Sequence, residues 1–278
     1  MTTLLFVVLL WLGSVLAGLT GALTGLGGGV VIVPLLVFGF GVDLRYAVGA
    51  SLVSVIATSS GAAAAYVKEG YSNLRIGMFL EIATTAGALV GAFLAVRLPT
   101  QLIGIVFGTV LVVSAFLSFR EKAVPMEARK ADPLATRLKM DSSFPTVNGP
   151  ESYHVQHVPG GFAMMFAAGT LSGLLGIGSG AFKVLAMDQV MKIPFKVSTT
   201  TSNFMIGVTA AASAGIYLRR GFIDPGLAMP VVLGVLIGSL LGTRVLMRAR
   251  VNWLRIVFSV VIVLLGIEMI YGSLTGKM

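Results

Sequence analysis

Long apolar runs dominate this chain and restrict what it can fold into. A helix needs about 20 apolar residues to cross the roughly 30 Å of hydrocarbon in a bilayer. Runs close to that length occupy 46–67, 76–96, 101–119, 197–218, 226–247 and 252–272. Two longer runs, 3–40 and 160–191, are each interrupted by glycines. We therefore expect an all-α integral membrane protein with about eight transmembrane segments.

The scarcity of charge supports the same fold class. Charged residues make up 11% of the 278 residues and the mean hydropathy is +0.95, whereas soluble domains carry roughly 25% charged residues. A soluble fold could not cover so much apolar side chain with polar groups, but a bilayer solvates it directly. The first run has no Lys or Arg before Arg45 and continues into further apolar sequence, which disfavours a cleaved signal peptide.

The chain repeats itself without a gap when it is shifted by 151 positions. The matched pairs include Gly18 and Gly169, Gly25 and Gly176, Gly27 and Gly178, Gly29 and Gly180, Ser51 and Ser202, Thr58 and Thr209, Tyr66 and Tyr217, Gly87 and Gly238, and Phe107 and Phe258. Chance matching of apolar residues would not keep one register for so long. We expect two homologous four-segment repeats, 1–119 and 160–278, an organisation typical of secondary transporters.

A polar linker, residues 120–159, joins the two repeats. It holds six of the Lys and Arg residues and both histidines, so the preference of positive charge for the cytoplasm places it inside the cell. With four crossings in each half, Arg97 and the Arg248 to Arg255 cluster would lie outside. Positive charge at matching places in the two halves favours parallel repeats. If the glycine breaks change the number of crossings, this conclusion reverses and the repeats are inverted.

The glycine interruptions are the most chemically informative feature. Residues 25–29 and 176–180 each place several glycines in the middle of an apolar run, where unpaired backbone costs several kcal/mol unless something satisfies it. A helix that restarts after such a break directs free N–H groups toward a cavity, which suits an anion. The alternative is that the glycines only permit close helix packing, as we expect at Gly87, Gly91, Gly238 and Gly242. Two breaks at equivalent positions favour a binding site.

The first break and its flanks resemble the sulfite exporter TauE/SafE family of bacterial and archaeal permeases. The resemblance lies in the glycine motif Gly18 to Gly29, in Val33-Pro34-Leu35-Leu36, in Val48-Gly49-Ala50-Ser51-Leu52 and in a weaker second copy. It implies a multi-pass carrier of sulfite, sulfonates or related organic acids in a prokaryotic plasma membrane, with possible proton coupling. The second copy departs from the pattern, since Ser179 replaces the middle glycine, Lys183 follows, and no proline stands opposite Pro34.

Lys183 is the strongest single candidate for binding an anion. A lysine inside a membrane helix costs about 2.5 to 3.5 kcal/mol and is usually functional or paired. The structural alternative is that it pairs with Asp188 or extends to the membrane interface. Glu81 and Glu268 also lie in apolar runs, where a buried carboxyl group could carry a coupling proton.

Hydroxyl and amide side chains complete the candidate site. Two equivalent segments carry them, and Ser51 and Ser202 are the best candidates. Such hydroxyls also commonly bond only a carbonyl four residues back. The predicted substrate-binding residues are Gly27, Gly28, Gly29, Ser51, Gly178, Ser179, Gly180, Lys183, Ser202 and Asn203.

Other functional classes find less support. The net charge of +9 comes from basic residues at the ends of apolar runs and in the linker, which argues against a nucleic-acid partner. No nucleophile and base set, HExxH motif or cysteine occurs, and His154 and His157 have no further ligands nearby in the sequence, so we expect neither an enzyme nor a cofactor. The alternative to an anion carrier is a cation channel or transporter of the same architecture.

Overall fold

The computed structural model describes residues 3–24, 28–68, 72–119, 132–146, 149–246 and 251–275. Most of these residues are helical. The first half contains α1 (Thr3–Thr24), α2 (Gly29–Pro34), the π-helical segment η1 (Leu35–Gly39), α3 (Leu44–Lys68), α4 (Leu74–Arg97) and α5 (Thr100–Phe119). The second half contains α7 (Val158–Leu175), α8 (Gly180–Leu185), the π-helical segment η2 (Ala186–Val190), α9 (Phe195–Arg219), α10 (Pro225–Leu246) and α11 (Val251–Leu274).

The helix boundaries of the two halves are spaced like the sequence matches. The starts of α2 and α8, of α3 and α9, of α4 and α10, and of α5 and α11 are each 151 residues apart. The π-helical segments η1 and η2 have the same spacing, although only the first follows a proline, Pro34. Proline is therefore not what sets the π-helical segment in both halves.

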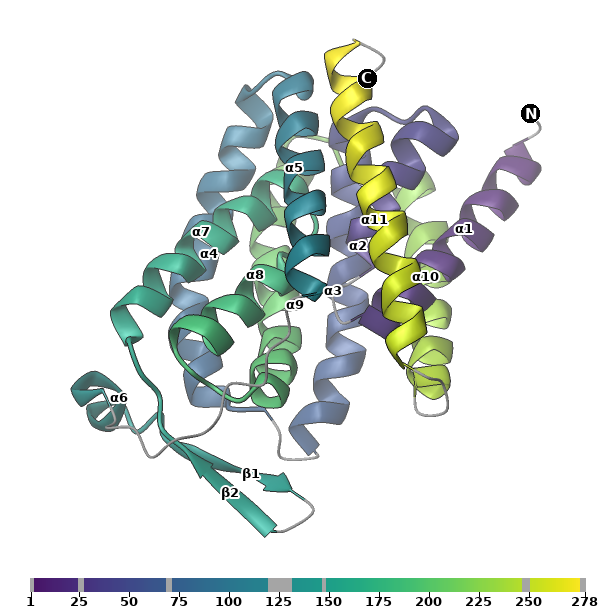
Figure 1. The fold of residues 1–278 in the computed structure, drawn as a ribbon. Coiled ribbons are helices and arrows are strands. Elements are labelled where there is room, and N and C mark those ends of the chain that lie inside the picture. Colours follow the sequence, from purple (N-terminus) through teal and green to yellow (C-terminus); the bar gives the residue numbers. More distant parts are fainter. Residues whose placement is uncertain are drawn as a thin grey trace.

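The halves interlock rather than pack as two separate bundles. Helix α1 packs on α10, and its counterpart α7 packs on α4, while α3 packs on α9 and α5 on α11. Figure 1 shows that equivalent helices run in opposite directions: α5 runs down toward the end of the molecule that carries the linker, whereas α11 runs up toward the end where the N-terminus also lies. The preference for parallel repeats is therefore not supported. The short α2–η1 segment turns back after α1, so the first half changes direction once more than its four long helices alone would.

Glycines allow the closest helix approaches between the halves. A Cβ atom added at Gly18 would lie 2.3 Å from the Val235 carbonyl oxygen, and one added at the equivalent Gly169 would lie 2.1 Å from that of Thr84. Real side chains cannot occupy such positions, so backbone packs on backbone. The prediction that glycines on α4 and α10 serve helix packing is confirmed for Gly87, Gly91 and Gly238. A Cβ atom added at each of them would lie 2.0 or 2.1 Å from a carbonyl oxygen of the neighbouring helix. The surroundings of Gly242 lie outside the part of the chain that the structure describes.

The outer faces of the helices are apolar. Exposed large apolar side chains lie along the long helices, among them Leu4, Ile82, Phe116, Leu240 and Leu264. Helices α4 and α7 are long and apolar enough in their described residues to cross a bilayer, and α1, α2–η1, α5, α10 and α11 contain shorter apolar stretches. An apolar exterior of this extent suits lipid rather than water.

The linker is partly structured and packs on one end of the bundle. It contains α6 (Pro133–Arg137) and a hairpin of β1 (Ser142–Thr146) and β2 (Gly149–Tyr153), seen at the bottom of Figure 1. The Asn73 amide nitrogen donates to the Met140 carbonyl and to the Tyr153 hydroxyl at 3.0 and 2.8 Å, while its oxygen caps α4 by accepting from the Ile76 amide. Burial raises the pKa of the Tyr153 phenol, which stays protonated at neutral pH.

Replacing Asn73 with alanine should destabilise the protein by about 1 to 2 kcal/mol, because the helix cap and both linker bonds are lost together. Thermal unfolding of the purified protein in detergent measures the change. Ser72→Ala is the matched control, since the neighbouring Ser72 hydroxyl is buried without a hydrogen-bond partner. Equal unfolding temperatures for both variants would mean that the linker does not dock through Asn73.

Candidate functional site

The second glycine break is held open by its backbone conformation. Gly176, Gly178 and Ser179 have φ angles of 69°, 70° and 45°, in the left-handed region that ends a helix. Helix α7 stops at Leu175 and α8 restarts at Gly180. Of the first break, Gly28 and Gly29 are described and buried, while residues 25–27, including the candidate Gly27, lie outside the described residues.

The two breaks meet in the interior between α3 and α9. The Ser51 hydroxyl on α3 donates to the Gly176 carbonyl at 2.7 Å, and a Cβ atom added at Gly29 would lie 2.6 Å from that hydroxyl oxygen and 3.0 Å from the same carbonyl. On the other side, the Ser202 hydroxyl on α9 donates to the Gly180 carbonyl at 3.3 Å. The equivalent serines therefore both fix the backbone of the second break.

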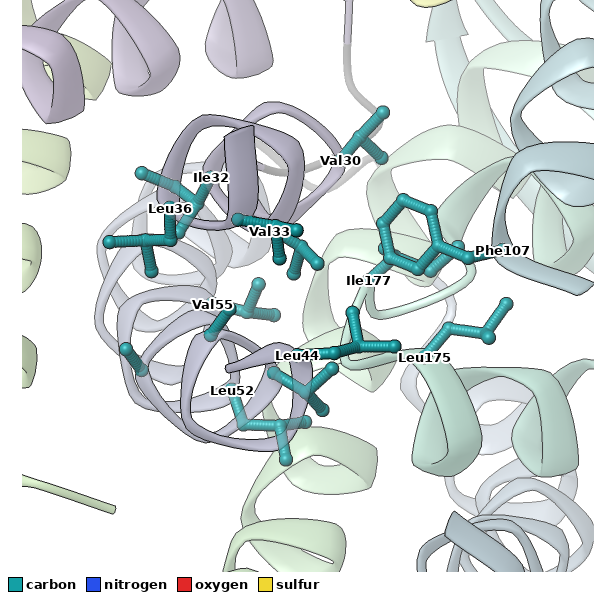
Figure 2. Packing of buried hydrophobic residues seen from close by; sticks show 14 of the residues in the cluster. Val30, Ile32, Val33, Leu36, Leu44, Leu52, Val55, Phe107, Leu175 and Ile177 are labelled. Carbon is teal, nitrogen blue, oxygen red and sulfur yellow. The ribbon is translucent and has the colours of Figure 1, made fainter. Parts of the chain in front are cut away.

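One side of this junction is apolar. Figure 2 shows Val30 and Val33 of α2, Val55 of α3 and Phe107 of α5 gathered around Ile177, which lies within the second break. These residues belong to one buried cluster. Such packing excludes water from that side and leaves the polar groups of the site on the side of α8 and α9.

Lys183 occupies the polar side and has no exposed surface. Its Nζ donates to the Thr209 Oγ1 at 2.5 Å, and Thr209 in turn donates to Glu81 Oε1 at 2.7 Å. The Thr85 hydroxyl also donates to Glu81 Oε1, at 3.1 Å. We call Lys183, Thr209 and Glu81 the charged trio. It joins α8 and α9 of the second half to α4 of the first.

The trio differs from the pairing considered from the sequence. Lys183 donates a hydrogen bond to Thr209 rather than to Asp188, which accepts one from the Gln189 side-chain amide at 2.6 Å. The two candidate carboxylates also separate: Glu81 is 7% exposed and belongs to the trio, whereas Glu268 lies on an exposed part of α11. Sequence spacing could not join Glu81 to Lys183, because they come from different halves of the chain.

Two buried oxygen atoms at the site have no hydrogen-bond partner among the residues that the structure describes. They are Oε2 of Glu81 and Oγ of Ser179. A buried polar atom without a partner usually costs about 1 to 3 kcal/mol, so it indicates a place for a ligand, a water molecule or a proton. Both atoms belong to residues at the second break or in the charged trio.

The remaining hydroxyl candidates behave mostly as ordinary helix residues. Ser54, Thr58 and Thr200 bond carbonyls three or four residues back in their own helices. Thr209 is the exception, because its hydroxyl also reaches across to another helix. Asn203 is half-buried on α9, outside the hydrogen-bonded set described above.

Comparisons with known proteins identify the family. The family model described as Sulfite exporter TauE/SafE matches residues 10–269. The "Probable membrane transporter protein YunE" of Bacillus subtilis is 30% identical over 97% of this chain and 98% of the relative. YdhB of the same organism, with the same description, is 26% identical over 87% of this chain and 89% of the relative.

The similarity extends to archaea. The "Probable membrane transporter protein MJ0441" of Methanocaldococcus jannaschii is 24% identical over 96% of both chains. No solved structure gives a significant match. The family match and the relatives cover nearly the whole chain, including both halves, both breaks and the charged trio. The chain therefore belongs to the sulfite exporter TauE/SafE family, a family of membrane transporter proteins.

Proposed function

We propose that this protein carries a small anion across the plasma membrane of a prokaryotic cell, with the anion held where the two glycine breaks meet. Sulfite, a sulfonate or a related organic acid is the expected substrate class, since the family is described as a sulfite exporter family. The observation that carries the proposal is the complete burial of Lys183 beside the second break. Within the described part of the chain this buried ammonium bonds a hydroxyl and no carboxylate directly, so it can attract an oxyanion strongly.

The arrangement of the halves supports a carrier rather than a fixed channel. We propose that eight long helices lie across the membrane, four in each half. The short α2–η1 and α8–η2 segments at the centre each return the chain toward the side from which it came, and this additional change of direction makes the two repeats inverted. Binding at the interface of such repeats allows one half to move against the other and expose the site to each side in turn. The mutual packing of α1 on α10 and α7 on α4 suits a movement of this kind.

The opposite directions of the halves also account for the charge distribution. At the end where the N-terminus and C-terminus lie, the described basic residues of the helix ends are Arg45, Arg97, Arg219 and Arg220. The other end carries the described part of the linker, Lys192, Lys196 and the ends of α10 and α11 that contain Arg244 and Arg255. We propose that the linker end is cytoplasmic, because positive charge is then concentrated inside.

Counterflow in liposomes tests the function. Purified protein is reconstituted into liposomes loaded with unlabelled anion, and uptake of labelled sulfite, methanesulfonate, sulfoacetate or a simple carboxylate is followed. Exchange of a sulfur anion above the protein-free rate is expected. Exchange of sodium or potassium ions without any anion exchange would overturn the proposal in favour of a cation transporter that uses Glu81.

Ser179→Gly should raise stability and weaken anion binding. Glycine adopts the 45° φ angle without the cost of about 1 to 2 kcal/mol paid by other residues, and the unpartnered hydroxyl disappears with the side chain. Thermal unfolding and the anion concentration for half-maximal exchange measure the two effects. Ser172→Ala is the control, because it removes another buried, unpartnered hydroxyl outside the break. An unchanged half-saturation in Ser179→Gly would remove Ser179 from the site.

A further inference from the structure

The charged trio is present in only one half of the duplicated fold. Shifted by 151 positions, Lys183, Thr209 and Glu81 correspond to Ile32, Thr58 and Val232. Ile32 is completely buried in α2, as Lys183 is in α8. The same helix arrangement is therefore built once with two charges and once with two apolar side chains, so the charges are not a requirement of the fold.

The trio balances its own charge. Helices α5 and α7 carry no charged residue within their bounds. The other charged side chains of the packed elements α3, α4, α9 and η2 are Arg45 and Lys68 of α3, Arg75 and Arg97 of α4, Lys196 and Arg219 of α9, and Asp188 of η2. All but Asp188 lie near helix ends, and Asp188 accepts a hydrogen bond from Gln189. Among the described residues, Lys183 and Glu81 thus form an interior pair of opposite charges joined through one hydroxyl.

Entry of an anion changes this balance. The Lys183 ammonium has three N–H groups and donates one of them to Thr209, so an oxyanion can accept hydrogen bonds from the others. The site would then hold two negative charges and one positive charge, far from water. Burial of an uncompensated charge is strongly unfavourable. A proton added to Glu81 restores neutrality, and Oε2, which is buried and has no hydrogen-bond partner, is the atom free to take it.

We propose that the protein moves one proton together with each singly charged anion, with Lys183 binding the anion and Glu81 carrying the proton. The inference rests on the proposed anion transport. On binding, the anion bonds Lys183, and a proton from water forms an O–H bond at Glu81 Oε2. On release the anion leaves, the O–H bond breaks, and the proton returns to water on the other side. Thr209 links the two events because it contacts both residues.

The test compares exchange with uptake driven by a pH gradient. Liposomes at about pH 8 inside are diluted into about pH 6, and uptake of each exchanging anion is compared with uptake without the gradient. Two pH units correspond to about a hundredfold difference in proton concentration, so the wild type should take up at least about tenfold more anion with the gradient. Glu81→Gln, which keeps the shape of the side chain but cannot take up the proton, should show a ratio within about twofold of one.

Glu268→Gln is the matched control, because it neutralises the exposed carboxylate of α11. This variant should keep the wild-type ratio. Protonation of the anion itself changes uptake equally in the wild type and in both variants, so the conclusion rests on the difference between their uptake ratios. Wild-type exchange with no response to the gradient, or a full response in Glu81→Gln, overturns the proton proposal and leaves anion transport standing. Absence of exchange for every anion overturns the proposed function itself.

Discussion

Replacing Lys183 with isoleucine is expected to abolish anion exchange and to lower the free energy of unfolding by about 3 to 5 kcal/mol. The loss of exchange follows from removal of the buried cation beside the second break. The loss of stability follows because the buried Glu81 carboxyl group loses its compensating partner, and breaking a buried pair from one side costs that much. Counterflow in liposomes and thermal unfolding in detergent measure the two effects.

The double variant Lys183→Ile with Glu81→Val separates stability from transport. It copies the residues that the first half carries at the equivalent positions, Ile32 and Val232. Replacing a buried pair by apolar residues of suitable size is often neutral or stabilising, so we expect near wild-type unfolding and no exchange. Recovery of exchange along with stability would mean that the trio is structural and the anion binds elsewhere.

Gly91→Ala is expected to disrupt the packing between the halves. The added Cβ would lie 2.0 Å from the Thr170 carbonyl oxygen, a backbone atom that cannot move without separating α4 from α7. We expect a loss of at least about 1 to 3 kcal/mol, seen as a lower unfolding temperature and poor recovery of monodisperse protein. Gly238→Ala should behave alike, because its Cβ would meet the Val15 carbonyl oxygen at the same distance.

Gly215→Ala provides the contrast. Gly215 lies in α9, and a Cβ there would meet nothing within 4 Å. Alanine should stabilise this helix by about 0.5 to 1 kcal/mol, since glycine is the poorer helix former. If the Gly91→Ala protein were as stable as the Gly215→Ala protein, the inference that α4 packs closely on α7 at Gly91 would be contradicted.

The helices themselves could be predicted from the sequence because each depends on a local run of apolar residues. The predicted runs 76–96 and 226–247 differ by at most two residues at either end from α4 and α10. The glycine breaks were also visible, because glycine disfavours helix within an apolar run. The relative direction of the two halves could not be predicted, since it depends on whether the short α2–η1 segment turns back. Neither the length nor the composition of that segment decides this.

The candidate site could be predicted only in part from the sequence, for a similar reason. Lys183 stands out alone because a charge in an apolar run is costly wherever it lies. Its connection to Glu81 through Thr209 arises from the packing of α4 against α9, which no local pattern encodes. The hydroxyl of Thr209 could not be distinguished from its counterpart at Thr58, because their neighbours in the sequence do not reveal which helix lies opposite.

Binding of labelled sulfite and sulfoacetate to the purified protein most directly tests whether the anion sits beside Lys183. The wild type and the Lys183→Ile, Glu81→Val double variant are compared in detergent, after unfolding has shown that both are folded. We predict saturable binding to the wild type, displaced by unlabelled sulfur anions, and none to the double variant. Equal binding to both proteins would contradict an anion site at the charged trio.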